Sequence, residues 1–149
     1  KVYFDAKEPN YLNDLILQLR NYIKDMDEIS AINFLLRFTQ TSFNYKTDTE
    51  QFSHEKVMLP EETIFYPFSD CEDRSIMFSY LVKSILGLKV VGVKFHDHLA
   101  TAVKLNTKID GDSFLIDGER FYNADPTYIN ANIGMIMPQY KNSKFSIIN

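Results

Sequence analysis

The spacing of apolar positions predicts two amphipathic helices near the start of the chain. Apolar side chains recur every three to four residues, the spacing that places them on one helix face. Asn10 is a suitable N-cap for the first helix, and Asp27 precedes the second, which we predict over residues 28–40. Thr39 interrupts the second stripe, so Phe38 is expected to make its last apolar contact. The stripes are Leu12, Leu15, Ile16, Leu19, Ile23 and Met26, then Ile29, Ile32, Leu35 and Leu36.

A third helix and a strand-rich second half complete the pattern. Helical spacing returns between Cys71 and Leu86, and Gly87 stands where a C-terminal cap glycine is expected. Beyond it the pattern is typical of strands, with a hairpin turn at residues 117–118. The predicted strands are residues 89–95, 99–105, 114–116 and 120–124. Because helices come first and strands later, we predict an α+β fold in which the Cys71 helix packs on an antiparallel sheet.

Residues 41–69 lack sustained periodicity and contain Pro60 and Pro67. A segment this long is unusual in a compact domain unless it has a function or short structure of its own. We interpret it as a wall or lid around a site. The alternative is an irregular surface crossing with a short helix at residues 60–62. The tail from Pro126 is also expected to be irregular.

Composition favours one ordinary globular domain over residues 1–149, with a helical part over 1–40 and a core over 41–149. Apolar residues make up 45% and charged residues 24% of the 149 residues, as in globular proteins. The net charge of −4 and the lack of a basic stripe argue against nucleic-acid binding. No run approaches the roughly 18 apolar residues of a membrane span, so we predict no membrane insertion. The compartment is left open.

Cys71 stands where a nucleophile could form, and as the only cysteine it excludes an intramolecular disulfide. Ser69 and Glu72 match the Ser-x-x-Glu capping box, which places Cys71 in the first turn of its helix. The partial positive charge there favours the nucleophilic thiolate, and backbone N–H groups can face an oxyanion. The alternative is a small buried apolar side chain, which is common for free cysteines.

Three acidic residues beside Cys71, namely Asp70, Glu72 and Asp73, oppose formation of the thiolate. Their negative charge disfavours the thiolate unless it is paired, for example with Arg74 or with a nearby imidazolium. Oxygen-rich clusters also suit calcium, so this ion is an alternative partner for the three carboxylates. Apart from that alternative, we predict no cofactor and no metal ligand.

His98 and Asp125 are the candidate partners of the thiol. In a strand, His98, Ala100 and Ala102 share one face, and the two alanines leave room for a closely packed helix. We therefore expect the Tyr80 and Leu81 side of the Cys71 helix to contact this face. Asp125 precedes a proline that ends a later strand, so it should lie at the rim of the sheet.

Residues 69–75, 98–103 and 125–128 follow one another in the order Cys–His–Asp and resemble the transglutaminase-like superfamily, the bacterial transglutaminase-like domains in particular. The resemblance covers roughly residues 45–138. Many members have glycine where this chain has Ser69, and an aromatic residue where it has Leu99.

The resemblance implies a papain-like fold and thiol-dependent acyl transfer. Cys71 would attack an amide carbonyl of a protein or peptide substrate, His98 would take and return the proton, and Asp125 would orient the imidazole. Water as acceptor gives a peptidase or amidase, which we favour over the transglutaminase reaction with an amine. The alternative is a non-catalytic module that binds a protein or glycan.

For His98 and Asp125 to meet, their strands must be antiparallel neighbours. A simple three-stranded meander would place Asp125 at the opposite end of the sheet. The strand over residues 114–116 must therefore lie outside the other two. Residues 106–112 can span roughly 23 Å, enough to return along a strand of about 17 Å.

Two other histidines leave alternatives open. His96 is the rival of His98 for the role of base. His96 and His98 alternate on one strand and could hold zinc together with His54, although no further ligand has convincing spacing.

Overall fold

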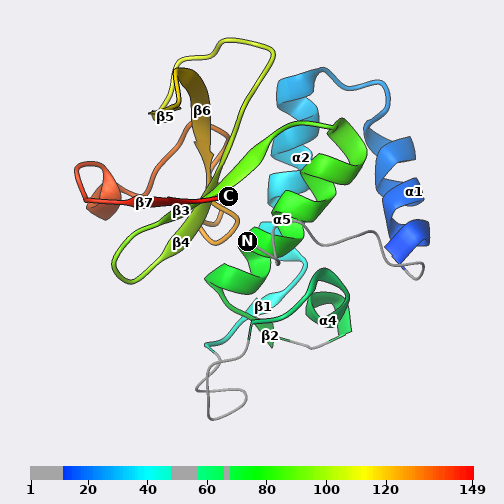
Figure 1. Ribbon diagram of the computed structural model, residues 1–149. Coiled ribbons are helices and arrows are strands. Elements are labelled where there is room, and N and C mark those ends of the chain that lie inside the picture. The colour runs from blue at the N-terminus through cyan, green and yellow to red at the C-terminus, as the bar shows by residue number, and fades with distance from the viewer. Residues whose placement is uncertain (1–11, 48–56, 66–67) are drawn as a thin grey trace.

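The computed structural model describes residues 12–47, 57–65 and 68–149. The chain has an α+β fold, as predicted, with the α-helices gathered on one side of a curled antiparallel sheet (Figure 1). The helices are α1 (Asn13–Ile23), α2 (Glu28–Thr41), α4 (Pro60–Phe65) and α5 (Cys71–Leu86), with a 3-10 helix η2 (Pro138–Tyr140). The strands are β1 (Asn44–Tyr45), β2 (Phe68–Ser69), β3 (Val90–Lys94), β4 (Leu99–Val103), β5 (Ser113–Ile116), β6 (Glu119–Ala124) and β7 (Ser146–Ile148).

The start of α2 follows its sequence signal. Asp27 is the N-cap, and its Oδ1 accepts the Ser30 N–H at 2.8 Å. Phe38 packs against the core as predicted, but Thr39 is itself fully buried. It is accommodated because its hydroxyl donates to the Leu35 carbonyl at 3.0 Å. Asn10, the predicted cap of the first helix, lies outside the described residues.

The main sheet has the order β5-β6-β4-β3-β7. β4 and β6 are antiparallel neighbours, with Thr101 opposite Ala124, and β5 lies outside β6. The arrangement inferred for the His98 and Asp125 strands is therefore confirmed. The hairpin turn between β5 and β6 is also confirmed, since Asp117 and Gly118 both have positive φ, 51° and 79°. The tail is less irregular than predicted, because β7 pairs with β3.

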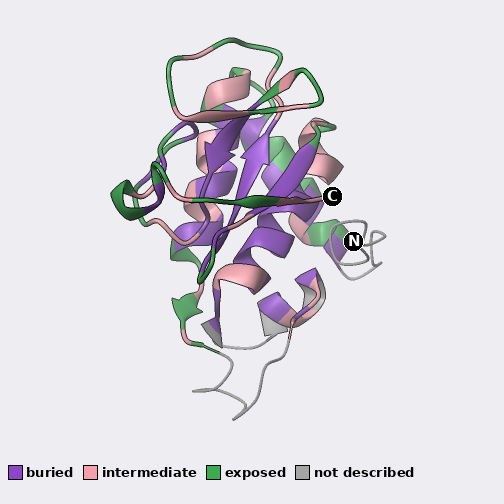
Figure 2. Cartoon of the chain, turned by 60° about the vertical axis from the view of Figure 1, so that its left-hand side comes forward, coloured by how far each residue is buried: buried purple, intermediate pink, exposed green. Residues whose placement is uncertain are grey.

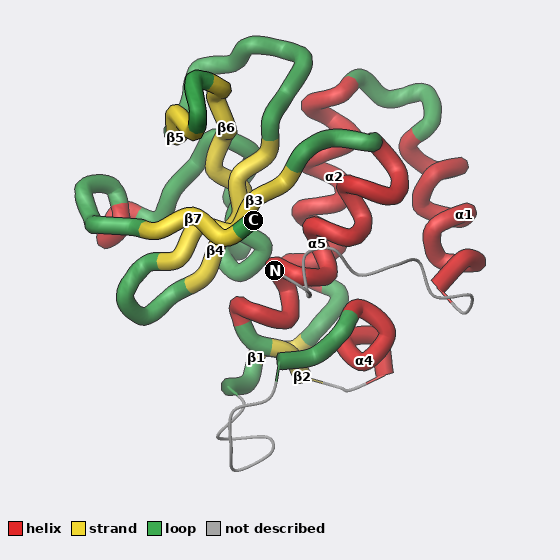
Figure 3. Tube along the Cα trace, in the orientation of Figure 1, coloured by secondary structure: helices red, strands yellow, loops and turns green. Residues whose placement is uncertain are grey.

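The packing of α5 corrects one expectation. Tyr80 and Leu81 belong to a buried cluster with Val103 of β4 and Ala124 of β6. The helix thus covers the sheet face opposite the one predicted (Figure 3). The predicted face belongs to another cluster, in which rings from β6 and η2 fill the space above the small alanine side chains. That cluster is Val91, Val93, Phe95, Ala100, Ala102, Phe121, Ile136 and Tyr140.

Burial follows this layered arrangement. The central strands and α5 are buried, whereas β7 and the long connections lie at the surface (Figure 2). Helix α5 ends at Gly87, whose φ of 66° is the left-handed cap predicted for it. Each described helix is too short or too polar to cross a bilayer.

The segment over residues 41–69 has short structure of its own. β1 and β2 form a parallel pair, and α4 extends the short helix considered at residues 60–62. Residues 48–56 and 66–67, including His54, lie outside the described residues. The interpretation of the segment as a wall or lid stays a prediction.

Candidate active site

Cys71 is the first residue of α5, in the first turn as predicted, and its side chain is half-buried. The N-cap is Asp70, whose Oδ1 accepts the N–H groups of Glu72 and Asp73 at 3.0 and 3.1 Å. The Asp73 carboxylate in turn accepts the Asp70 N–H at 3.0 Å. The capping box therefore lies one residue later than the predicted Ser69–Glu72 pair. Aspartate caps a helix as well as serine does, which makes the sequence signal degenerate.

Ser69 does not cap α5, because its hydroxyl forms a hydrogen bond with Arg74. Ser69 belongs to β2, and its hydroxyl oxygen accepts a hydrogen bond from Arg74 Nε at 3.1 Å. The almost fully buried guanidinium also donates to the carbonyls of Gln40 and Phe43, at 3.2 and 2.6 Å. Burial lowers the pKa of Arg74, and the negative charges of its neighbours, Cys71 among them, oppose that effect.

His98 and Asp125 form a buried pair at the end of the sheet. His98 Nε2 lies 2.7 Å from Asp125 Oδ2. The other carboxylate oxygen of Asp125 accepts the N–H groups of Thr127 and Tyr128, at 2.9 and 3.2 Å. Asp125 is thus fixed by the turn that follows it, as is typical of aspartate before a turn.

Cys71 is the partner of His98 on the other side. Burial would lower the pKa of His98, but hydrogen bonds with Asp125 and Cys71 and the charges of both raise it from 6.5 to about 9. With Nε2 directed at Asp125, Nδ1 is the nitrogen left for the thiol. The structure therefore brings the three predicted site residues together, and an imidazolium at His98 can balance a thiolate at Cys71.

The rival histidine lies elsewhere. The His96 side chain is 80% exposed and lies 3.4 Å from the Asp97 carboxylate, at the tip of the β3–β4 hairpin. Among the described residues, no three His, Cys, Asp or Glu side chains are grouped to hold a metal. The acidic neighbours of Cys71 have other partners: Asp73 also accepts the Met58 N–H at 2.9 Å, and Glu72 lies 3.8 Å from Lys94 Nζ.

Two site neighbours, Gln40 and Tyr140, were missed by sequence reasoning. The Gln40 amide is buried and donates to the backbone carbonyls of Asp125 and Ala131, at 3.1 and 3.0 Å. The Tyr140 ring stacks on His98, with ring centroids 5.2 Å apart. Each lies far from its partner in the sequence, and neither belongs to a recognisable motif. The local sequence pattern therefore gives no signal for either residue.

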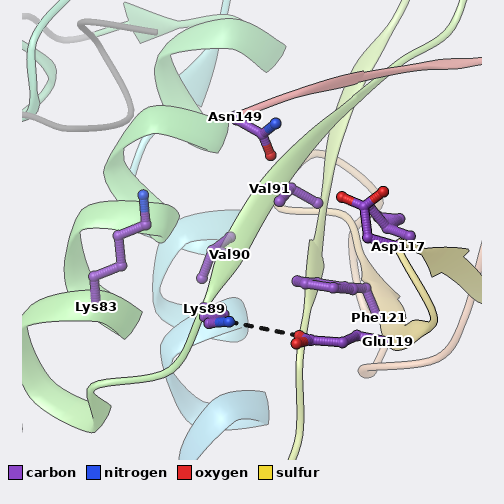
Figure 4. Close-up of a pocket in the computed structure, with 9 residues that line it drawn as sticks. Lys83, Lys89, Val90, Val91, Asp117, Glu119, Phe121 and Asn149 are labelled. Atoms are coloured by element: carbon purple, nitrogen blue, oxygen red, sulfur yellow. Dashed lines mark ion pairs between the residues drawn. The ribbon is translucent and has the colours of Figure 1, made fainter.

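One cavity in the described part of the chain lies away from these residues. A space of about 340 Å³ is lined by α5, the start of β3 and the β5–β6 hairpin, with Lys89 Nζ 3.6 Å from Glu119 at its edge (Figure 4). Cys71, His98 and Asp125 do not line it. Its lining includes Lys89 and Glu119, which form an ion pair with each other. The candidate site is therefore placed at Cys71, His98 and Asp125, whose side chains have complementary chemistry.

Comparisons with known proteins add information on the fold. No family model matches the chain, and no curated protein matches it. A crystal structure from Cytophaga hutchinsonii, described as a "putative cysteine protease", is similar with a TM-score of 0.58 and 10% sequence identity. The match covers 98% of this chain and 50% of that protein, so this chain spans about half its length. At this identity the similarity shows the fold alone.

Proposed function

We propose that the chain carries a papain-like, transglutaminase-like cysteine hydrolase site, with Cys71 as nucleophile, His98 as general base and acid, and Asp125 as the residue that orients His98. The observation that carries the proposal is the position of His98, which is buried 2.7 Å from Asp125 and whose pKa is raised by both Asp125 and Cys71. A buried imidazole between a carboxylate and a cysteine in the first turn of a helix is the arrangement that thiol acyl chemistry requires. The similarity to a "putative cysteine protease" supports the same class.

In the first half of the reaction the Cys71 thiolate attacks the amide carbonyl carbon. The backbone N–H of Cys71, at the start of α5, can donate to the developing oxyanion, because the first N–H groups of a helix have no partner within it. The His98 imidazolium gives its proton to the leaving amine as the C–N bond breaks. A thioester on Cys71 and a neutral His98 remain.

In the second half, His98 takes a proton from water as the water oxygen attacks the thioester. The C–S bond then breaks, which releases the carboxylic acid and restores the thiolate and imidazolium. An amine in place of water would give transamidation by the same steps. We favour hydrolysis, in line with the description of the similar structure.

Isotope labelling tests the proposal without a known substrate. A peptide mixture is incubated with the protein in H₂¹⁸O that contains a fluorescent primary amine, and the products are analysed by mass spectrometry. Hydrolysis places ¹⁸O in new carboxyl groups, whereas transamidation attaches the amine. We expect ¹⁸O incorporation by the wild type and by His96→Ala, a matched change at the exposed histidine, and none by Cys71→Ala. Equal labelling by wild type and Cys71→Ala, or no labelling by either, contradicts the proposal and favours a binding module.

A further inference from the structure

Tyr140 lies against the face of His98, although the two residues are far apart in the sequence. The phenol ring, contributed by η2, is nearly parallel to the imidazole, with an interplanar angle of 12° and ring centroids 5.2 Å apart. Phe95 stacks on Tyr140 at 4.6 Å and on His98 at 6.4 Å. Tyr140 is 8% exposed and Phe95 2%, so the three rings form a buried group beside the proposed catalytic site.

The phenol oxygen fixes the Tyr140 ring in place. Its hydroxyl donates to Asp97 Oδ1 at 2.8 Å, and Asp97 lies in the hairpin turn that joins Phe95 to His98. Burial and the bond to Asp97 raise the pKa of Tyr140 to about 12, so the hydroxyl keeps its proton near neutral pH. Tyr140 therefore contacts the His98 hairpin twice, through its ring face and through its hydroxyl.

The plane of an imidazole is not set by its own rotamer. The torsion about the Cβ–Cγ bond of histidine is broad, unlike the staggered torsion before it. The hydrogen bond to Asp125 holds one nitrogen but allows the ring to tilt about that contact. A flat, buried ring on the face of the imidazole removes this tilt and keeps Nδ1 directed at the thiol.

We propose that Tyr140 is a positioning residue for His98, and that its ring holds the plane of the imidazolium and excludes water from the His98–Asp125 pair. The proposal rests on the proposed function, since it assigns Tyr140 a part in forming the Cys71–His98 ion pair. The face of an aromatic ring also attracts a cation, which favours the protonated imidazole. The charged groups around the ring stack are Asp97, Asp125, His96 and Cys71.

Three variants separate the ring, the hydroxyl and general packing. Tyr140→Phe keeps the stacked ring and loses the bond to Asp97. Tyr140→Leu removes the ring. Phe121→Leu is the matched control, because Phe121 is a buried aromatic residue of the same cluster and contributes to none of the stacks around His98.

The assay is the rate of Cys71 alkylation by iodoacetamide at about pH 6 relative to about pH 9, with the nitrogen NMR signals of His98 as a second readout. We expect Tyr140→Leu to lower the pH 6 rate roughly five- to thirtyfold, the range that one desolvated cation–ring contact covers. Tyr140→Phe should stay within about threefold of wild type. The His98 signals of Tyr140→Leu should show the neutral imidazole at lower pH than in wild type.

The outcomes distinguish the two proposals. If Tyr140→Leu matches Phe121→Leu in both readouts while alkylation of the wild type depends on His98, the positioning role is wrong and the ion pair stands. If the wild type and His98→Ala have the same pH profile, the proposed function itself fails.

Discussion

The Asp125 and Cys71 side chains determine how His98 responds to pH. The pKa of His98 is about 9 in the folded chain, above the value of 6.5 expected for an unfolded one. The protonated imidazole therefore stabilises the fold fully below about pH 6.5, and this stabilisation is lost as the pH rises to about 9.

A histidine replacement tests this dependence. Relative to wild type, His98→Gln should lower the free energy of unfolding most near pH 6, by roughly 3 kcal/mol, and by progressively less toward pH 9. Urea denaturation at a series of pH values measures the difference. His96→Gln is the control, since its exposed side chain should give a small difference at every pH. A difference for His98→Gln that stays constant across this range would contradict the charged imidazole.

Asp125→Asn is expected to be milder than His98→Ala. The amide keeps an oxygen for the N–H groups of Thr127 and Tyr128, so the turn after β6 survives. The imidazolium loses its counter-charge but keeps its position beside Cys71. The rate of Cys71 alkylation by iodoacetamide near neutral pH compares the two variants. A loss in Asp125→Asn as large as that in His98→Ala would mean that the carboxylate charge is essential to the ion pair.

Among the elements, α5 shows what local sequence signals predict well and where they fail. The apolar stripe, Cys71 in the first turn and the Gly87 cap were all predictable, because each depends on residues close in sequence. The choice between Ser69 and Asp70 as N-cap was not predictable from the local sequence. It depends on Arg74, which engages the Ser69 hydroxyl only once β2 is in place. The sheet face that α5 covers depended in the same way on rings contributed by β6 and η2.

The position of the cap can be tested directly. Asp70→Ala removes the acceptor of two N–H groups at the start of α5 and should destabilise the chain by about 1–2 kcal/mol. Asp70→Asn should cost much less, because asparagine is an equally good N-cap. Thermal or urea unfolding provides the comparison. A loss in Asp70→Asn as large as that in Asp70→Ala would show that the carboxylate charge, rather than the cap, is what matters.

At the scale of the whole molecule, helix α2 holds the segment that follows Asp125 from a distant part of the sequence. Helix α2 contacts the segment after Asp125 at three positions: Gln40, Arg37 at 2.6 Å from Asn130, and Asn33 at 2.8 Å from the Ile133 N–H. Sequence reasoning selected the three candidate site residues because each has a local signature. It could not find these supporting contacts, since Gln40 is separated from Asp125 by 85 positions. That the chain is a single domain over residues 1–149 stays a prediction.

Gln40→Leu tests this support. The change removes the side-chain donor to the Ala131 carbonyl and the acceptor of the Asn130 N–H, at a cost of about 1–3 kcal/mol for each unsatisfied group. The Asp125 carbonyl loses the Gln40 bond but keeps the Tyr128 N–H at 3.3 Å. We expect lower stability together with slower alkylation of Cys71 near pH 6, because Asp125 loses part of its support. Gln18→Leu, at an exposed position of α1, is the matched control. Wild-type alkylation in a destabilised Gln40→Leu would show that α2 stabilises the fold without supporting the site.

The most direct test of the account is the pH dependence of Cys71 alkylation in wild type and His98→Ala, measured with iodoacetamide from about pH 5 to about pH 9. An ion pair predicts that the wild-type thiol reacts rapidly well below neutral pH, and that His98→Ala loses this reactivity and follows an ordinary thiol with a pKa of about 8.5. Because the chain has one cysteine, the label reports on Cys71 alone. Two superimposable profiles, both rising only toward pH 8.5, would contradict the Cys71–His98 pair and the hydrolase built on it.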